Sequence, residues 1–370
     1  IDTIIQDIQI TNKEYGVYAG FNRDFLSETL KLSASMRLDK NQNFNFLYSP
    51  AASIVYTPTE KDVIRVSLSS AIRNPTLTDQ YLNYDVGQAV LLGNINGFGF
   101  DQYFVNIDSL EQYFLGPLYN PNALLGGFMQ VDPIRPEKVK TIETGYRTTL
   151  FNKLYVDVSA YYSVYDDFIG YQTGATFKFG STKTASQQDV LDGWATAVGD
   201  TIDNYNDMLL PSIQGYRVAA NAKDKVSTKG FTLGLNYFLN QYLTINGNYS
   251  WNKLNKKGTD DPIIPAYNTP EHKFNLGFAA RDISILTTNN WGFSMNYKWV
   301  EGFIFEGSPQ FTGEVPTYNQ LDAQINKTVP ELSATFKVGA SNLLNNFSYQ
   351  VYGGPRVGRM VYTSLVFDLK

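Results

Sequence analysis

The amino-acid sequence predicts an all-β protein, a transmembrane antiparallel up-and-down β-barrel of which about 13 strands are present. Three observations lead to this prediction. Apolar and polar residues alternate along most of the chain, the polar set is almost uncharged, and the connections between alternating runs are short and long in turn. Barrels of the bacterial outer membrane combine a lipid-facing outside, a hydrated lumen, short periplasmic turns and long outer loops.

The alternation is clearest in residues 230–254, GFTLGLNYFLNQYLTINGNYSWNKL. Successive side chains of a strand point to opposite faces, and a tight connection between two strands makes a hairpin. One face would carry Phe231, Leu233, Leu235, Tyr237 and Leu239, then, after a turn at residues 240–242, Leu243, Ile245, Gly247, Tyr249 and Trp251. The opposite face is mostly Thr, Asn, Ser and Gly, with few of the charged residues that coat a soluble sheet. Such a face suits water inside a barrel.

The same period of two defines the other strands in order. Runs are expected at residues 15–21, 30–38, 52–56, 64–68, 138–150, 154–165, 274–280, 293–299, 321–325, 334–340 and 361–369, and a strand from about Tyr216 should lead into the hairpin. Residues 58–62, 151–153 and 329–333 are short, turn-forming connections. Long excursions cover residues 73–136 and 170–215, whereas the outer connection near residues 41–43 is short. No helix of three or more turns is expected.

Composition agrees with a membrane barrel and excludes several other classes. Aromatic content is 15%, with 26 Tyr and 24 Phe, and charged content is only 18% of the 370 residues. The chain has no Cys, so disulfides and thiolate sites are excluded. A net charge of −5 argues against a nucleic-acid partner. No apolar run approaches the roughly 20 residues of a membrane-spanning helix.

Catalytic and metal-binding patterns are weak. The one histidine, His272, begins an expected strand, and a structural role is favoured there. Two acidic pairs at residues 166–167 and 260–261 fit solvated loops better than a calcium site, which needs six or more oxygen ligands. Gly-x-Ser-x-Gly and Walker-type phosphate loops are absent. We therefore expect no enzyme activity, no cofactor and no metal.

Four segments resemble the barrel of TonB-dependent outer-membrane receptors, in the style of Bacteroidetes-type bacteria. They are SPAASIVYTPTEKDVIRVSLSSAIRNPTL (residues 49–77), RPEKVKTIETGYRTTLFNKLYVDVSAYYSVYDDFI (135–169), YNTPEHKFNLGF (267–278) and NLLNNFSYQVYGGPRVGRMVYTSLVFDLK (342–370). They contain the family's Arg-Asn-Pro, Pro-Glu-Lys, Glu-x-Gly-Tyr-Arg, Pro-x-His-Lys and Asn-Leu-Leu-Asn elements. These elements occur in the same order as in the family, and the resemblance covers essentially the whole chain.

The resemblance implies an outer-membrane importer with a barrel of about 22 strands. It also implies an N-terminal plug that carries the TonB-contacting box. Residues 1–370 contain no counterpart of the plug or of the first strands, so we expect them to be the C-terminal portion of the barrel. Open sheet edges would be costly in lipid, which predicts that other strands complete the wall. The expected partners are outer-membrane lipid, the plug and remaining strands, TonB through the plug, and a small-molecule, glycan or peptide ligand. A surface lipoprotein could cap the mouth.

Two sets of candidate functional residues follow. The first excursion is rich in aromatic residues, which would be covered either by packing against neighbouring loops as a lid or by a ligand in a binding cup. These two interpretations are compatible. Substrate-binding candidates in the outer loops are Arg73, Asn74, Tyr81, Tyr84, Tyr103, Phe104, Tyr113, Tyr119 and Trp194, of which Arg73 and Asn74 belong to the rim element of the resemblance. Cations that alternate with apolar neighbours should face the lumen or the plug, because lipid exposure is costly; they are Arg37, Arg65, Arg147, Lys298 and Lys337, with Lys31.

Two other functions remain compatible with the sequence. One is a passive porin of about 14–16 strands, which a chain of this length could build. The other is a soluble all-β glycan-binding module or glycan-active enzyme, against which the uncharged polar face argues. The imported ligand is open between siderophore, glycan, peptide, cobalamin and metal chelate.

Overall fold

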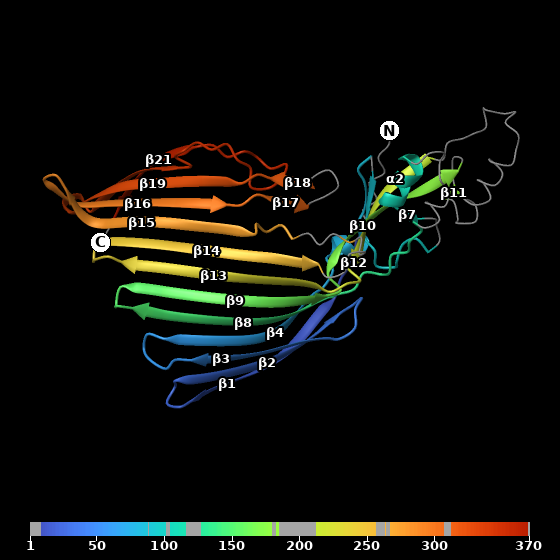
Figure 1. Ribbon diagram of the computed structural model, residues 1–370, viewed down its shortest axis with the longest axis horizontal. Coiled ribbons are helices and arrows are strands. Elements are labelled where there is room, and N and C mark those ends of the chain that lie inside the picture. The colour runs from blue at the N-terminus through green and yellow to red at the C-terminus, as the bar shows by residue number, and fades with distance from the viewer. Residues whose placement is uncertain are drawn as a thin grey trace, which may run out of the picture.

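A computed structural model describes residues 9–87, 89–100, 104–115, 127–179, 183–184, 212–256, 263, 267–306 and 312–368. Its largest part is one antiparallel sheet of 13 strands in which neighbours in space follow one another along the chain (Figure 1). The strands are β1 (Glu14–Phe25), β2 (Leu30–Asn41), β3 (Leu47–Tyr56), β4 (Val63–Arg73), β8 (Glu137–Leu150), β9 (Leu154–Asp166), β13 (Val226–Phe238), β14 (Leu243–Lys256), β15 (His272–Ile285), β16 (Thr288–Val300), β19 (Tyr318–Val329), β20 (Ala334–Ser341) and β21 (Met360–Phe367). The predicted fold class and strand number are confirmed.

The two faces of this sheet are chemically different because the register keeps the period of two aligned across strands. Tyr146, Val158, Leu233, Tyr249, Phe274 and Trp299 form one continuous row across six strands. The next row, on the opposite face, is Arg147, Asp157, Gly234, Asn248, Asn275, Lys298 and Gln320. A shift of one residue would exchange the faces, so the hydrophobic pattern fixes the register. We call these the apolar face and the polar face.

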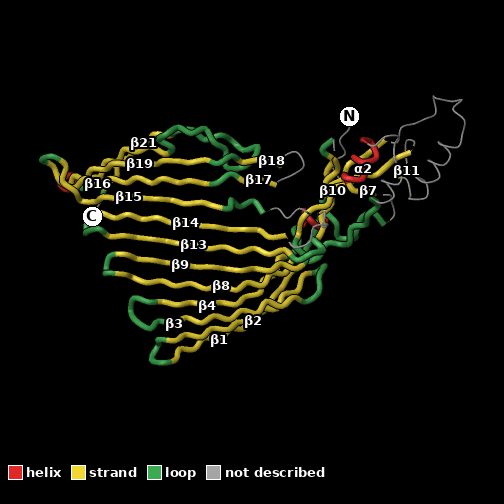
Figure 2. The backbone as a smooth tube through the Cα atoms, in the orientation of Figure 1, coloured by secondary structure: helices red, strands yellow, loops and turns green. Residues whose placement is uncertain are grey.

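Long connections lie at one end of the sheet and short turns at the other (Figure 2), except that the short connection between β2 and β3 lies at the long-connection end. At the short-turn end, four residues join β1 to β2 and a 3-10 turn, η1 (Pro330–Leu332), joins β19 to β20. At the opposite end, the small hairpin of β17 (Phe303–Glu306) and β18 (Thr312–Val315) extends the connection after β16. None of the described helices is long and apolar enough to span a membrane.

The two long excursions contain a second, six-stranded sheet at the long-loop end. It comprises β5 (Asn83–Asp85), β6 (Ala89–Leu92), β7 (Phe104–Asn106), β10 (Ile169–Phe179), β11 (Lys183–Thr184) and β12 (Ser212–Asn221), with the helices α1 (Leu77–Tyr81) and α2 (Ile107–Leu115) nearby. We call the described parts of residues 74–136 and 167–225 the cap. The strand predicted from about Tyr216 is β12, so it pairs with β10 and β6 in the cap and does not belong to the wall.

The large sheet is open. Its order begins at β1 and ends at β21, and these two described strands do not pair with each other. Every residue of β1 and β21 is exposed. Each edge strand therefore presents unpaired backbone N–H and C=O groups, which hydrocarbon cannot satisfy.

Candidate functional site

The cap has its own hydrophobic core, to which both excursions contribute. Phe104 and Val131 from the first excursion pack with Phe168 and Val218 from the second. The Phe104 ring meets Phe98 edge-on at 4.9 Å between centroids. Residues separated by more than a hundred positions in the sequence thus form one folded unit, and the aromatic richness of the first excursion is partly explained by burial.

Beneath this core, charged residues converge where the cap joins the wall. Nη1 of Arg73, at the end of β4, lies 3.5 Å from Oε2 of Glu137 at the start of β8. The same oxygen accepts a 3.0 Å hydrogen bond from the backbone N–H of Ile169. The Glu137 side chain is only 6% exposed, whereas that of Arg73 is 53% exposed, so the guanidinium is the part that a solute could contact.

A second half of this constellation comes from α1, β10 and β12. The Tyr171 hydroxyl donates to Oδ1 of Asp79 over 3.3 Å. The guanidinium carbon of Arg217 lies 3.6 Å from the centroid of the Tyr171 ring, which is close for a cation–π contact. Burial raises the pKa of the Tyr171 hydroxyl. The nearby Asp79 carboxylate raises this pKa further, whereas Arg217 and Arg73 lower it. Tyr171 is therefore a neutral hydrogen-bond donor.

We call Arg73, Asp79, Glu137, Tyr171 and Arg217 the rim cluster. Its geometry is locally fixed by a capping box at α1, in which Thr76 and Asp79 exchange hydrogen bonds. This box holds the Asp79 carboxylate in place below Tyr171. Two guanidinium groups and a phenol can recognise oxygen-rich anionic groups, because arginine matches carboxylate and phosphate geometry.

The predicted substrate-binding residues lie in different environments. Arg73 belongs to the rim cluster. Asn74 donates a hydrogen bond to Glu14, and its Oδ1 is buried with no hydrogen-bond partner among the described residues. The Tyr81 hydroxyl accepts a 2.7 Å hydrogen bond from Asn43, and Tyr84 is 60% exposed on β5. Phe104 is 0% exposed and belongs to the cap core, so its burial accounts for this aromatic residue.

The remaining substrate-binding candidates are not placed by the structure. Tyr113 lies on α2, but its side chain is not among those described. Tyr103, Tyr119 and Trp194 lie outside the described residues. These four stay predictions.

The candidate lumen cations lie on the polar face by register. Arg37 pairs with Asp39 over 2.8 Å, and Arg65 pairs with Asp157 over the same distance. Lys298 lies 5.6 Å from the centroid of the Tyr318 ring. Arg147 aligns with Asp157, and Lys337 aligns with Asn326 and Ser364. Lys31 aligns with Asp24.

Sequence reasoning missed Asp79, Glu137, Tyr171 and Arg217 as members of one cluster. Two signals were present: the Thr-x-x-Asp capping pattern of residues 76–79, and Glu137 within the Pro-Glu-Lys element. Neither signal indicates that β10 and β12 fold back over the end of β4. Tyr171 and Arg217 carried no local signal.

The described residues include no group of three His, Asp or Glu side chains that could hold a metal ion. His272 accepts or donates a 2.6 Å hydrogen bond at Nδ1 with the Tyr249 hydroxyl, and the two rings stack. The acidic pair at residues 166–167 is engaged in two ion pairs, Asp166 with Lys225 and Asp167 with Arg135. Residues 260–261 lie outside the described part of the chain.

A sheet with an apolar face opposite a polar one, and with its long connections at one end, is typical of the walls of outer-membrane β-barrels. A family model described as "TonB dependent receptor-like, beta-barrel" matches residues 3–343. The chain therefore belongs to the TonB-dependent receptor β-barrel family, whose barrels are outer-membrane proteins involved in receptor-mediated transport. The finer resemblance to Bacteroidetes-type receptors stays a prediction.

Solved structures share this fold at low identity. The FrpB iron transporter from Neisseria meningitidis (F3-3 variant) is 14% identical, with a TM-score of 0.56 over 96% of this chain and 45% of that chain. The siderophore receptor PirA from Acinetobacter baumannii is 13% identical, with a TM-score of 0.58 over 96% and 45%. The copper transporter OprC is 14% identical, with a TM-score of 0.57 over 96% and 48%. The chain thus spans about half the length of these proteins. No curated protein sequence matches it.

Proposed function

We propose that this chain is the C-terminal portion of the barrel of an active transport receptor. The complete receptor captures a scarce solute at its outer loops and imports it across the outer membrane with energy delivered through TonB. Family membership and the half-length coverage of related structures support this proposal. The open edges of β1 and β21 support it as well, because further strands of the same receptor would satisfy them.

The observation that carries the proposal is that the two ends of the wall differ in structure. The cap, the rim cluster and every long connection lie at one end of the wall, and apart from the short connection between β2 and β3 the short turns lie at the other. A folded cap at the long-loop end supports a role for that end in solute recognition. Chemical conversion of the solute is not part of the proposal, because the rim cluster offers recognition groups without a nucleophile and base pair.

The rim cluster favours a solute with anionic oxygen groups. Arg73 is half exposed and Arg217 stacks on a phenol that remains protonated. The related structures are named an iron transporter, a siderophore receptor and a copper transporter. A metal chelate with carboxylate or phenolate oxygens is therefore the solute class that we propose to test first, followed by acidic glycans and peptides.

The test is uptake by cells that express the complete receptor. Cells with and without functional TonB would be offered ferric and cupric chelates, oligosaccharides and oligopeptides. We expect uptake of one class that disappears without TonB. Uptake that persists unchanged without TonB would contradict the proposal and favour the passive porin.

A variant pair locates recognition in the rim cluster. Arg217→Gln and Tyr171→Phe should weaken solute binding about tenfold, because each removes a charged or hydrogen-bonding contact. Arg281→Gln, at the short-turn end of β15, is the matched control and should bind as the wild type does. Equal binding by all variants would exclude the rim cluster as the capture site.

A further inference from the structure

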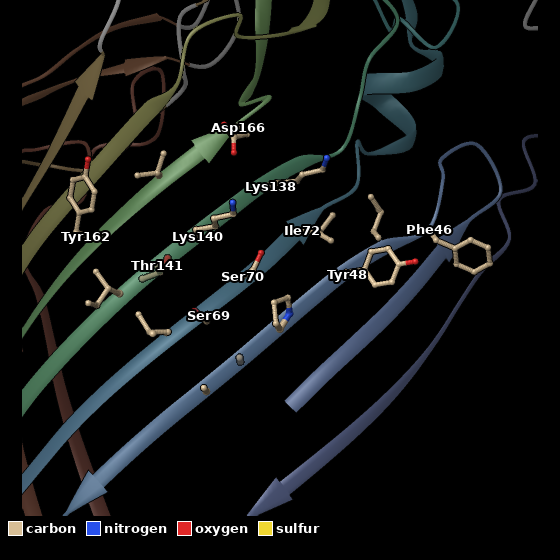
Figure 3. A pocket seen from close by; sticks show the side chains of 17 residues that line it. Phe46, Tyr48, Ser69, Ser70, Ile72, Lys138, Lys140, Thr141, Tyr162 and Asp166 are labelled. Carbon is tan, nitrogen blue, oxygen red and sulfur yellow. The ribbon is translucent and has the colours of Figure 1, made fainter. Parts of the chain in front are cut away.

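A groove of about 940 Å³ lies outside the candidate functional site, on the wall itself (Figure 3). It crosses β3, β4, β8 and β9 close to the cap. Register shows which face it occupies. Ile142 aligns with Leu68 on one side and Tyr162 on the other, which continues the apolar face. The groove therefore opens toward the surroundings of the wall and not toward the polar face.

Two lysines project from this apolar face at the cap end of β8. Lys140 lies in the row of Ser70 and Val164, and Lys138 lies in the row of Ile72 and Asp166. Figure 3 shows both side chains at the groove, between the labelled residues of β4 and β9. They are the second and fourth residues of β8, so both lie near the end of the strand rather than at its middle.

No described residue neutralises the positive charge of this pair. Both lysines are exposed, and within the described part of the chain neither forms an ion pair or a side-chain hydrogen bond. Among the described residues that line the groove, the one carboxylate is that of Asp166, which is paired with Lys225 over 3.0 Å. Lys229, in the row of Tyr162, adds a further cation 5.6 Å from the centroid of the Trp251 ring. The net local charge is positive although the whole chain carries −5.

The rest of the groove is mostly apolar, and small side chains along part of its lining leave room for a ligand. Pro50 and Ala52 on β3 and Ser70 on β4 leave space between the larger Tyr48 and Tyr162. A cationic end next to an apolar trough is complementary to an amphiphile with an anionic head and a hydrocarbon tail. Charged side chains on a lipid-facing wall are tolerated at the headgroup level and disfavoured at the midplane.

We propose that this wall groove binds a phosphorylated lipid of the outer leaflet, with its phosphate between Lys138 and Lys140 and an acyl chain along Pro50 and Ala52. The inference rests on the proposed function, because it requires the wall to lie in the outer membrane with the cap outside. Lysines attract anionic lipid headgroups through charge. The groove adds a shape that holds one lipid in place.

The experiment uses the complete receptor, purified in detergent, stripped of lipid and titrated with bis-phosphorylated lipid A. Native mass spectrometry would count bound molecules. We expect one tightly bound lipid A and much weaker binding of zwitterionic phosphatidylethanolamine. The double variant Lys138→Gln/Lys140→Gln should weaken lipid A binding about 25-fold, since each lysine near an anionic lipid surface contributes about a factor of five.

Two further variants separate the groove from general electrostatics. Ala52→Trp keeps every charge and fills the trough, so it should also weaken lipid A binding. Arg23→Gln/Lys327→Gln removes two cations from the same face at the short-turn end, and should bind as the wild type does. Migration of the unboiled protein on gels would confirm that each variant is folded.

The inference is overturned if Lys138→Gln/Lys140→Gln or Ala52→Trp binds lipid A as tightly as the wild type. Its failure can be told apart from failure of the proposed function. A receptor that imports its solute with TonB but binds no lipid A leaves the proposed function intact and removes this inference. A wild-type receptor that is absent from outer-membrane fractions removes both.

Discussion

The guanidinium of Arg65 reaches the carboxylate of Asp157 across an entire intervening strand, with 2.8 Å between Nη2 and Oδ1. Arg65 lies on β4 and Asp157 on β9, and β8 separates them. The residue beside Arg65 on β8 is Gly145, the glycine of the Glu-x-Gly-Tyr-Arg element. A Cβ at this position would lie 2.5 Å from Arg65 Nε. The missing side chain is therefore what allows the ion pair to form.

Replacement of Gly145 tests this relationship. Gly145→Ala should displace Arg65, break its contact with Asp157 and lower the free energy of unfolding by about 1 kcal/mol, the upper range for a partly exposed ion pair. Urea unfolding of the complete receptor, followed by gel migration without boiling, would measure it. Gly234→Ala is the control, because its Cβ would lie 3.8 Å from the nearest atom. An equal loss of unfolding free energy in both variants would mean that the contact between Arg65 and Asp157 does not contribute to stability.

The same pairing changes what is expected of the lumen cations. Arg65 is held by Asp157, whereas Arg147 forms no ion pair with any described residue. If the plug docks on the polar face, Arg147→Ala should loosen it more than Arg65→Ala. Trypsin sensitivity of the plug in the complete receptor measures this difference. Unchanged plug retention in both variants would exclude a docking role for the two arginines.

A third prediction concerns pH at the turn between β3 and β4. Hydrogen bonds from Thr59, Tyr146 and Thr148 lower the pKa of Asp62 to about 2. A carboxylate whose pKa is lower in the folded state stabilises the fold above its unfolded pKa of about 4, and this stabilisation is lost as pH falls toward 2. The unfolding midpoint of the wild type should thus fall between about pH 4 and pH 2 more than that of Asp62→Asn. Identical pH profiles would show that the turn does not contribute.

The wall was predictable from sequence because apolar and polar residues alternate in the same way along each of its strands. Leu233 and Gly234 alternate in the same way as Val158 and Asp157 beside them, so local pattern alone fixes both faces. The alternation does not identify the sheet to which a strand belongs when the chain forms two sheets. Tyr216, Val218 and Ala220 also alternate, but they pack into the cap core, and a period of two does not say which sheet a strand joins.

The rim cluster was predicted only in part for a related reason. Arg73 sits in a recognisable rim element, whereas its partners come from β8, β10, β12 and α1 and meet only through tertiary packing. Phe104 shows a second limit of the sequence pattern, because it is buried in the cap core. An aromatic residue in a long loop is compatible with either burial or ligand contact, and only the packing of the two excursions against each other decides for burial.

This packing gives a fourth prediction. Phe104→Ala should destabilise the cap by about 3–5 kcal/mol, the usual cost of removing a fully buried ring. The cap should then become sensitive to proteases while the wall keeps its resistance to unfolding. Tyr84→Ala, at an exposed aromatic residue of the same excursion, should have little effect. Simultaneous loss of cap and wall would contradict the separate core of the cap.

The last prediction concerns the two faces of the wall, on which every functional proposal depends. Leu235 aligns with Val156 and Gly247, and Asn236 aligns with Tyr155 and Asn246. Spin labels at residues 235 and 236 of the complete receptor in lipid should therefore differ sharply. The first should be relaxed by oxygen, which concentrates in hydrocarbon, and the second by a water-soluble nickel reagent. Equal access of the nickel reagent to both labels would mean that water covers both faces, as in a soluble sheet. That result would contradict both the proposed transport function and the proposed lipid site in the groove.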